Sequence, residues 1–197
     1  MQDKRCVHLD FHTSELIEGI GAGFDAEEFK ANLIKSGIDS ITVFAKCHHG
    51  CFYYEDTKFF KHPHLSCSLL DEQVKACKEA GVSAKIYISA GFDEYTARQH
   101  PEWLWRNEKI QANPDSAFRR LCFNTPYMEL LVAQTEEVVR KYMPDGVFFD
   151  IMADWPCYCE YCQAEMVEKG LDPDSYEDHL QQAKDVLALY IERIEKM

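Results

Sequence analysis

The sequence predicts an α/β fold of the (β/α) TIM-barrel type, with about the first four β/α units present as an N-terminal half barrel. Four short β-rich runs alternate with helix patterns, which indicates a parallel sheet with right-handed crossovers. Connections that follow the strands are long, whereas those that lead into strands are only a few residues long. Long loops at the carboxyl ends of parallel strands are typical of barrel enzymes. A flavodoxin-like sheet stays open as an alternative, although no glycine-rich phosphate loop follows the first run.

The expected strands are runs that are nearly continuous in apolar or β-branched residues, as strands covered on both faces should be. They are residues 7–11, 40–45, 84–89 and 146–151.

The expected helices carry their own start and stop signals. Asp25 is the predicted N-cap of the first helix, and Gly37 stands where a left-handed C-terminal residue belongs. A second helix at 69–80 closes at Gly81, and a third begins with Thr125 as N-cap and Pro126 in the first turn. Two further helices are expected, over 160–169 and from 175 to the end.

Chain length limits how much of a barrel these units can form. A complete eight-stranded barrel takes about 250 residues, whereas this chain has 197 residues and four β/α units. We therefore expect a single barrel catalytic domain over residues 1–197 that is incomplete at its C-terminus. Its open sheet edges would be covered by a missing second half or by self-association into a homo-oligomer.

Composition excludes several classes of function. Acidic side chains outnumber basic ones by 34 to 21, so a nucleic-acid partner is not expected. Neither an apolar run of membrane-spanning length nor a signal peptide is found, so we expect a cytoplasmic protein without membrane contact. In that reducing compartment the nine cysteines are predicted to be thiols or metal ligands.

The strongest local pattern is a cysteine cluster after the fourth strand. Cys157, Cys159 and Cys162 are spaced so that their thiolates can converge on one tetrahedral ion, most commonly zinc. Cys122, just before the third helix, is the best candidate for a fourth ligand. A closed four-thiolate site would be structural, and the alternative is a group of buried cysteines without a metal.

Polar side chains also stand where strands end. Asp150 ends the fourth strand. A carboxylate in that apolar setting needs a hydrogen-bonding or charged partner, or a role in binding or catalysis. Lys46, His48 and His49 follow the second strand and could hydrogen-bond a polyhydroxylated ligand. The other interpretation of Asp150 is a residue that caps its own loop.

The first strand carries three polar residues, His8, Asp10 and His12, which strand alternation would place on one face. This pattern allows a metal-dependent amidohydrolase with a catalytic ion at these residues. The spacing is unfavourable, because His8 and His12 would lie about 13 Å apart on an ideal strand.

Aromatic residues gather in the loops that follow the strands, where flat rings could stack on sugars. They are Phe52, Tyr53, Tyr54, Tyr95, Trp103, Trp105 and Trp155.

These motifs together resemble the hypothetical glycosyl hydrolase 6 family over most of residues 6–170. The segments that carry the resemblance are 8–13, 44–50, 87–93, 100–103 and 146–150. Members look like TIM-barrel glycosidases related to α-L-fucosidases and family 42 β-galactosidases. Residues 46–50 are similar to the Lys-His-His-x-Gly-Phe segment of fucosidases, whose histidines contact the sugar, except that Cys47 separates Lys46 from the histidines.

The resemblance also implies roles for single residues. Fucosidases place their nucleophilic aspartate in a Trp-Phe-Asp context, which residues 148–150 match. The β-galactosidases carry a Cys-Tyr-Cys-x-x-Cys zinc site whose fourth cysteine lies in Arg-x-x-Cys-Phe-Asn-x-Pro, and residues 119–126 fit that pattern with Cys122. The Asn-Glu pair of those galactosidases is missing here, so Asp150 is better interpreted as a fucosidase-like nucleophile.

The predicted function is therefore a retaining glycoside hydrolase with a carbohydrate substrate, Asp150 as nucleophile and a structural zinc. The substrate-binding set would be Asp10, His12, Lys46, His48, His49 and Trp103. Retaining chemistry needs a second carboxyl about 5 to 5.5 Å away. Asp10, Asp93, Glu94 and Asp154 are candidates, as are residues of the missing strands. The alternative function is a non-catalytic carbohydrate-binding domain.

Overall fold

A computed structural model of the chain describes residues 5–112 and 117–197. The chain forms two compact units, which are described separately. The first consists of Met1–Ser89 and Val138–Asp150, and the second of Ala90–Glu137 and Ile151–Met197.

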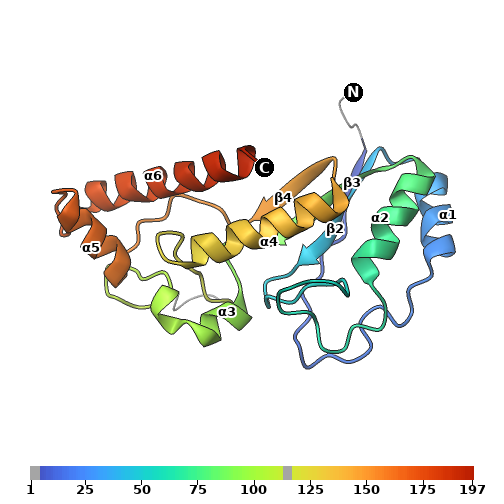
Figure 1. The fold of residues 1–197 in the computed structure, drawn as a ribbon, viewed down its shortest axis with the longest axis horizontal. Coiled ribbons are helices and arrows are strands. Elements are labelled where there is room, and N and C mark those ends of the chain that lie inside the picture. The colour runs from blue at the N-terminus through green and yellow to red at the C-terminus, as the bar shows by residue number, and fades with distance from the viewer. Residues whose placement is uncertain (1–4, 113–116) are drawn as a thin grey trace. The chain divides into compact units, whose positions relative to one another are not determined.

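The first unit is built on a parallel sheet of four strands in the order β1-β2-β3-β4 (Figure 1). The strands are β1 (Cys6–His8), β2 (Ser40–Lys46), β3 (Ser83–Ser89) and β4 (Gly146–Asp150). Sequential strands are neighbours and helices separate them, so the predicted α/β fold of four β/α units is confirmed.

Helices α1 (Ala26–Ser36) and α2 (Leu69–Ala80) lie side by side in this unit (Figure 1). Local signals set their ends, as the sequence predicts. The carboxylate of Asp25 accepts a hydrogen bond of 2.9 Å from the backbone N–H of Glu28, which caps α1. Gly37 and Gly81 end the two helices with φ of 61° and 68°, a left-handed conformation that glycine adopts without strain.

One aromatic row crosses the sheet, with one ring from each strand. The ring of Phe44 stacks on Tyr87 with centroids 3.8 Å apart, and Tyr87 stacks on Phe148 at 5.8 Å. His8, on the opposite edge strand from Phe148, nevertheless lies 5.2 Å from that ring. Rings on the two edge strands can meet only if the sheet is curled, so these four strands form a curved wall, as in part of a barrel.

The first strand is shorter than predicted, and the expectation of a strand over residues 7–11 is wrong beyond His8. The last ladder-like bond joins the N–H of Leu9 to the carbonyl of Thr42 at 3.2 Å. Phe11 then packs its ring against Phe44, at 4.8 Å, instead of continuing the ladder. Aromatic packing in the core therefore ends β1, so strand alternation does not extend to Asp10 and His12.

The second unit is mainly helical. It contains α3 (Glu94–Gln99), a 3-10 turn η1 (Pro101–Trp103), α5 (Glu160–Glu168), α6 (Tyr176–Glu195) and the greater part of α4 (Tyr127–Tyr142). Helix α5 packs on α6 (Figure 1), and Arg193 of α6 bonds Glu129 of α4 at 2.8 Å. In the described part of the chain, no helix has the length and apolar character to cross a bilayer.

The helix α3 was not predicted, because its six residues are too few for a clear apolar period. Asp93 caps it by accepting from the N–H of Thr96 at 2.8 Å. The predicted Thr125 signal is present at the start of α4, where its hydroxyl accepts from the N–H of Tyr127 at 3.2 Å.

Candidate functional site

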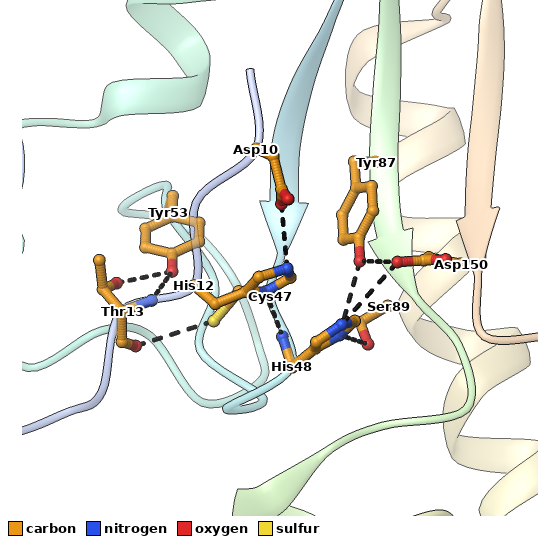
Figure 2. A network of polar contacts seen from close by, with 9 residues as sticks. All are labelled: Asp10, His12, Thr13, Cys47, His48, Tyr53, Tyr87, Ser89 and Asp150. Carbon is orange, nitrogen blue, oxygen red and sulfur yellow. Dashed lines mark hydrogen bonds and ion pairs between the residues drawn. The ribbon is translucent and has the colours of Figure 1, made fainter. Parts of the chain in front are cut away.

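A network of polar side chains lies at the carboxyl ends of β2, β3 and β4 and in the segment after β1, all within the first unit (Figure 2). Its members come from four separate segments of the chain. They are Asp10, His12, His48, Tyr87, Ser89 and Asp150.

A side chain of the neighbouring strand β3 orients the Asp150 carboxylate. The hydroxyl of Tyr87 donates to Oδ2 of Asp150 at 2.6 Å, and Nε2 of His48 lies 3.8 Å from the same oxygen. About a third of the Asp150 side chain, 35%, stays exposed, so a ligand can reach it. Burial and the bond to Asp150 raise the pKa of Tyr87, so its hydroxyl keeps its proton and remains a donor at neutral pH.

His48 is a neutral imidazole in this network. Burial, and then the neighbouring His12, lower its pKa to about 4. Its Nδ1 lies 2.7 Å from the hydroxyl of Ser89. An uncharged imidazole has one donor and one acceptor nitrogen, so the bond between Nδ1 and Ser89 sets which of the two Nε2 is.

His12 stacks on His48, with centroids 3.8 Å apart and planes 14° from parallel. Its Nδ1 accepts from the backbone N–H of His48 at 3.2 Å, and its Nε2 lies 3.0 Å from Oδ1 of Asp10 (Figure 2). A nitrogen that accepts from a backbone N–H carries no proton, so the ring proton is on Nε2 and points to Asp10. Asp10 thereby orients the ring on which His48 stacks.

The segment that carries Asp10 and His12 is anchored behind the network. The hydroxyls of Thr13 and Tyr53 lie 2.7 Å apart, and the thiol of Cys47 points to the carbonyl of Thr13 at 3.8 Å (Figure 2). Tyr53 is fully buried, so the sugar-stacking role considered for it is wrong and its ring packs the core. Phe52 and Tyr54 are buried in the same way.

Three other predicted substrate-binding residues lie elsewhere. Lys46 is fully buried at the end of β2, and His49 is half-buried in the turn closed by the bond from Gly50 N to Cys47 O at 3.0 Å. Trp103 belongs to the second unit, in η1, where its ring stacks on His100 at 3.7 Å. The structure thus brings Asp10, His12, His48 and Asp150 together in one network.

Tyr87 and Ser89 were not among the site residues predicted from the sequence. A tyrosine within an apolar strand is usually core, so no local signal marked it. The register between β3 and β4 is what brings both residues to Asp150. Ser89 lies opposite Asp150 in the ladder, and Tyr87 is on the same face of β3 as Ser89 by strand alternation. That register is known only once β3 and β4 are paired.

The predicted amidohydrolase ligands do not converge. His8 packs its ring against Phe44 and Phe148, whereas Asp10 pairs with His12. Over residues 5–112 and 117–197, the group of metal-ligating side chains that does converge is the four-cysteine cluster.

That cluster, Cys122, Cys157, Cys159 and Cys162, lies in the second unit, and all four residues are buried. The four Sγ atoms lie within 4.8 Å of one another, and those of Cys122 and Cys162 are 3.5 Å apart. A tetrahedral zinc with Zn–S bonds of about 2.3 Å needs Sγ atoms about 3.8 Å apart. The donor set and its spacing therefore fit a divalent ion such as zinc.

Surrounding groups hold the cysteine loops in place. The carbonyl of Cys162 accepts from the amide of Gln182 at 3.1 Å, and the carbonyl of Cys157 lies 3.0 Å from Nδ1 of His179. The amide of Asn124 points to Sγ of Cys162 at 3.8 Å. Hydrogen bonds that hold the ligand-bearing loops in this way are typical of metal sites.

A curled parallel β/α sheet defines a segment of a (β/α) barrel, and the polar network lies at the carboxyl ends of its strands (Figure 2), where barrel enzymes carry their active sites. The chain belongs to the hypothetical glycosyl hydrolase 6 family, whose sequence profile matches residues 25–151. No protein of curated function matches the sequence.

Several solved structures are similar to this chain. α-L-Fucosidase isoenzyme 2 from Paenibacillus thiaminolyticus is 44% identical over 98% of this chain, with a TM-score of 0.93. The α-fucosidase of Thermotoga maritima is 21% identical over 90% of the chain, with a TM-score of 0.53. A β-galactosidase from the psychrophilic Marinomonas ef1 is 15% identical over 84%, with a TM-score of 0.57.

This chain spans only part of each of these proteins. It covers 30% of the Paenibacillus fucosidase chain, 34% of the Thermotoga chain and 25% of the Marinomonas chain. The two likenesses of lower identity show the fold alone.

Proposed function

We propose that this chain forms the first β/α units of a retaining glycoside hydrolase that acts on α-L-fucosides, with Asp150 as the nucleophile. The observation that carries the proposal is the Asp150 carboxylate at the end of β4, bonded by Tyr87 at 2.6 Å beside the neutral His48. Membership of a glycosyl hydrolase family and 44% identity to a fucosidase support the substrate class.

In the first step an Asp150 oxygen attacks the anomeric carbon while the bond to the leaving oxygen breaks. An acid residue gives its proton to that oxygen, and a covalent glycosyl-enzyme forms. In the second step water attacks the anomeric carbon, gives its proton back to the same residue and releases Asp150. Tyr87 keeps its proton throughout and fixes the direction of the carboxylate.

The acid/base residue must be a second carboxyl group. Three of the four candidates already have other partners: Asp10 pairs with His12, Asp93 caps α3 and Glu94 bonds Arg119 at 2.8 Å. We therefore assign the acid/base role to polypeptide outside these 197 residues, with Asp154 as the remaining candidate within them.

Sugar hydroxyls would be recognised by polar groups around Asp150. We assign this role to Asp10, His12 and His48 in the network and to the adjacent, half-buried His49. The ring of His12, held by Asp10, stacks on His48 and positions it, and burial keeps His48 uncharged.

In this proposal the zinc is structural and takes no part in catalysis. Four thiolates close the coordination sphere, so no position is left for water or substrate. Zinc at Cys122, Cys157, Cys159 and Cys162 would link the segment before α4 to the loop that follows β4.

The test traps the covalent intermediate on the longest polypeptide that carries this sequence. A 2-deoxy-2-fluoro-α-L-fucosyl fluoride should label Asp150, as read by peptide mass spectrometry, and a panel of nitrophenyl glycosides should show turnover of the α-L-fucoside. Asp150→Asn should abolish both label and turnover. The exposed Asp174→Asn variant is the control and should behave as wild type.

Label on another carboxylate, or near-normal turnover by Asp150→Asn, would overturn the assignment of the nucleophile. Binding of L-fucose without any hydrolysis, measured by calorimetry on the same polypeptide, would favour the non-catalytic carbohydrate-binding alternative instead.

A further inference from the structure

Arg120 of the second unit lies between two tryptophan rings. Its guanidinium carbon is 3.5 Å from the ring centroid of Trp155 and 5.0 Å from that of Trp105. Tryptophan is the best ring for a cation–π contact, and arginine is the cation that most often makes one. The two rings therefore hold the guanidinium in one place.

The positive charge of Arg120 has no carboxylate partner in the described part of the chain. Its Nε is buried and lacks a hydrogen-bond partner there. The adjacent arginine differs, since Arg119 bonds Glu94 through two nitrogens, at 3.1 Å and 2.8 Å. A half-buried arginine whose Nε is shielded from water and has no hydrogen-bond partner is costly, and a negative group nearby would offset that cost.

The segments that hold Arg120 are those that carry the cysteines. Arg120 stands two residues before Cys122, and Trp155 two residues before Cys157. Trp105 packs against the four-cysteine cluster, and its indole N–H donates to the carbonyl of Pro156 at 2.9 Å. The backbone N–H of Trp105 donates to the carbonyl of Arg120, also at 2.9 Å.

One pocket of the second unit is lined by both groups, because Arg120, Trp105 and Trp155 share it with Cys122, Cys157 and Cys162. A divalent ion bound by four thiolates has a net charge of −2, which burial penalises. A fixed cation that lines the same pocket would offset part of that charge, because Coulomb interactions are stronger near buried groups such as these cysteines.

We propose that Arg120 is the positioning residue and counter-cation of the four-cysteine metal site, whose ligand is a thiophilic divalent ion such as zinc. Stacked between Trp105 and Trp155, it ties the Cys122 segment to the Cys157 loop and compensates the negative charge of the loaded cluster. This inference rests on the proposed zinc site.

The experiment compares zinc affinity of the wild-type chain with that of Arg120→Met, Arg120→Lys and the matched control Arg119→Met. Zinc content is measured first, and the dissociation constant then follows from competition with a chromogenic chelator. Arg120→Met should weaken zinc binding at least about tenfold, the usual effect of losing a group that holds the metal ligands in place. Arg120→Lys keeps the charge but not the planar stacking group, so its zinc affinity should lie between those of wild type and Arg120→Met. Arg119→Met should bind zinc as wild type does.

A role in folding alone would lower the melting temperature of Arg120→Met without changing its zinc affinity, and that result would overturn the proposal. Wild-type protein without stoichiometric zinc would overturn the zinc site itself, so the two failures are distinguishable. If Arg120→Met does not fold, Trp155→Leu, which removes one ring from the stack, is judged by the same tenfold criterion.

Discussion

The hydroxyl of Tyr87 and the carboxylate of Asp150 are joined across neighbouring strands by a hydrogen bond of 2.6 Å. In the ladder Asp150 lies opposite Ser89, so Tyr87 reaches it from two residues earlier on β3. A charge-assisted bond of this kind orients the carboxylate strongly. The direction of Asp150 is therefore set by β3 as much as by its own strand.

Tyr87→Phe should lower kcat/KM of the longest active polypeptide about 10- to 100-fold. The variant removes one hydrogen bond to a charged group, a loss of about 1.5 to 3 kcal/mol, and tenfold in rate corresponds to about 1.4 kcal/mol. Steady-state kinetics with nitrophenyl α-L-fucoside measure the change. The matched control is Tyr142→Phe, which removes a similar 2.7 Å bond to Asp71 in the same unit. Equal losses of activity in both variants would contradict a specific role for Tyr87.

Acidification should destabilise the chain through His48. Its pKa is about 4 in the fold, below the ordinary value of 6.5, because burial and then His12 disfavour the charged ring. The unfolded chain therefore binds the proton first. The contribution of His48 to the free energy of unfolding is therefore fully present above pH 6.5 and is lost as the pH falls toward 4. The total loss is about 3 kcal/mol.

Urea unfolding at several pH values between 7 and 4 measures this loss. His48→Gln has no titrating ring, so its free energy of unfolding should fall less steeply over that range than the wild-type value. His64→Gln is the comparison, since it changes a histidine outside the network. Parallel curves for wild type and His48→Gln would show that His48 does not carry the pH dependence.

Removal of the metal should unfold the second unit before the first. Structural zinc supplies folding free energy directly, so Cys122→Ser, or chelation of the wild-type protein, should lower the melting temperature and expose thiols to titration. Zinc content by mass spectrometry should be one ion per chain for wild type. Cys6→Ser, which changes an exposed cysteine outside the cluster, should retain it. A Cys122→Ser protein with full zinc content would refute the assigned ligand set.

Gly91→Ala should be destabilising by about 1 to 3 kcal/mol through overpacking. A methyl group at Gly91 would clash with the carbonyl oxygen of Ile151 and lie 2.7 Å from its Cγ2. Ile151 itself has φ of 59°, a conformation that a β-branched residue rarely adopts, so it has little freedom to move away. Gly23→Ala, where the added methyl meets nothing within 4 Å, is the control in urea unfolding. Similar stabilities for the two variants would contradict the steric argument.

Elements with local signals were predictable from the sequence. The ends of α1 and α2 follow from Asp25, Gly37 and Gly81, because capping depends on residues within one turn. Strand β1 was predicted too long, because Phe11 leaves the ladder to pack on Phe44, a contact between segments distant in the chain.

The candidate site was predictable only in part. Asp150 and the histidines stand at strand ends, where position along the chain is informative, and the resemblance to fucosidases marked the same residues. Tyr87 carried no such mark, since its role depends on the pairing of β3 with β4. The spacing of Cys157, Cys159 and Cys162 predicted a metal site, and Cys122 lies within 4.8 Å of them as expected.

The sequence by itself determined the order of strands and helices along the chain, the helix caps and the local cluster of Cys157, Cys159 and Cys162, because each depends on residue type and spacing over a few positions. Tertiary structure alone decided which side chains meet: His12 stacked on His48, Tyr87 bonded to Asp150, and Arg120 between two tryptophans. These contacts join segments tens of residues apart, and their geometry is set by sheet register and core packing rather than by local preference.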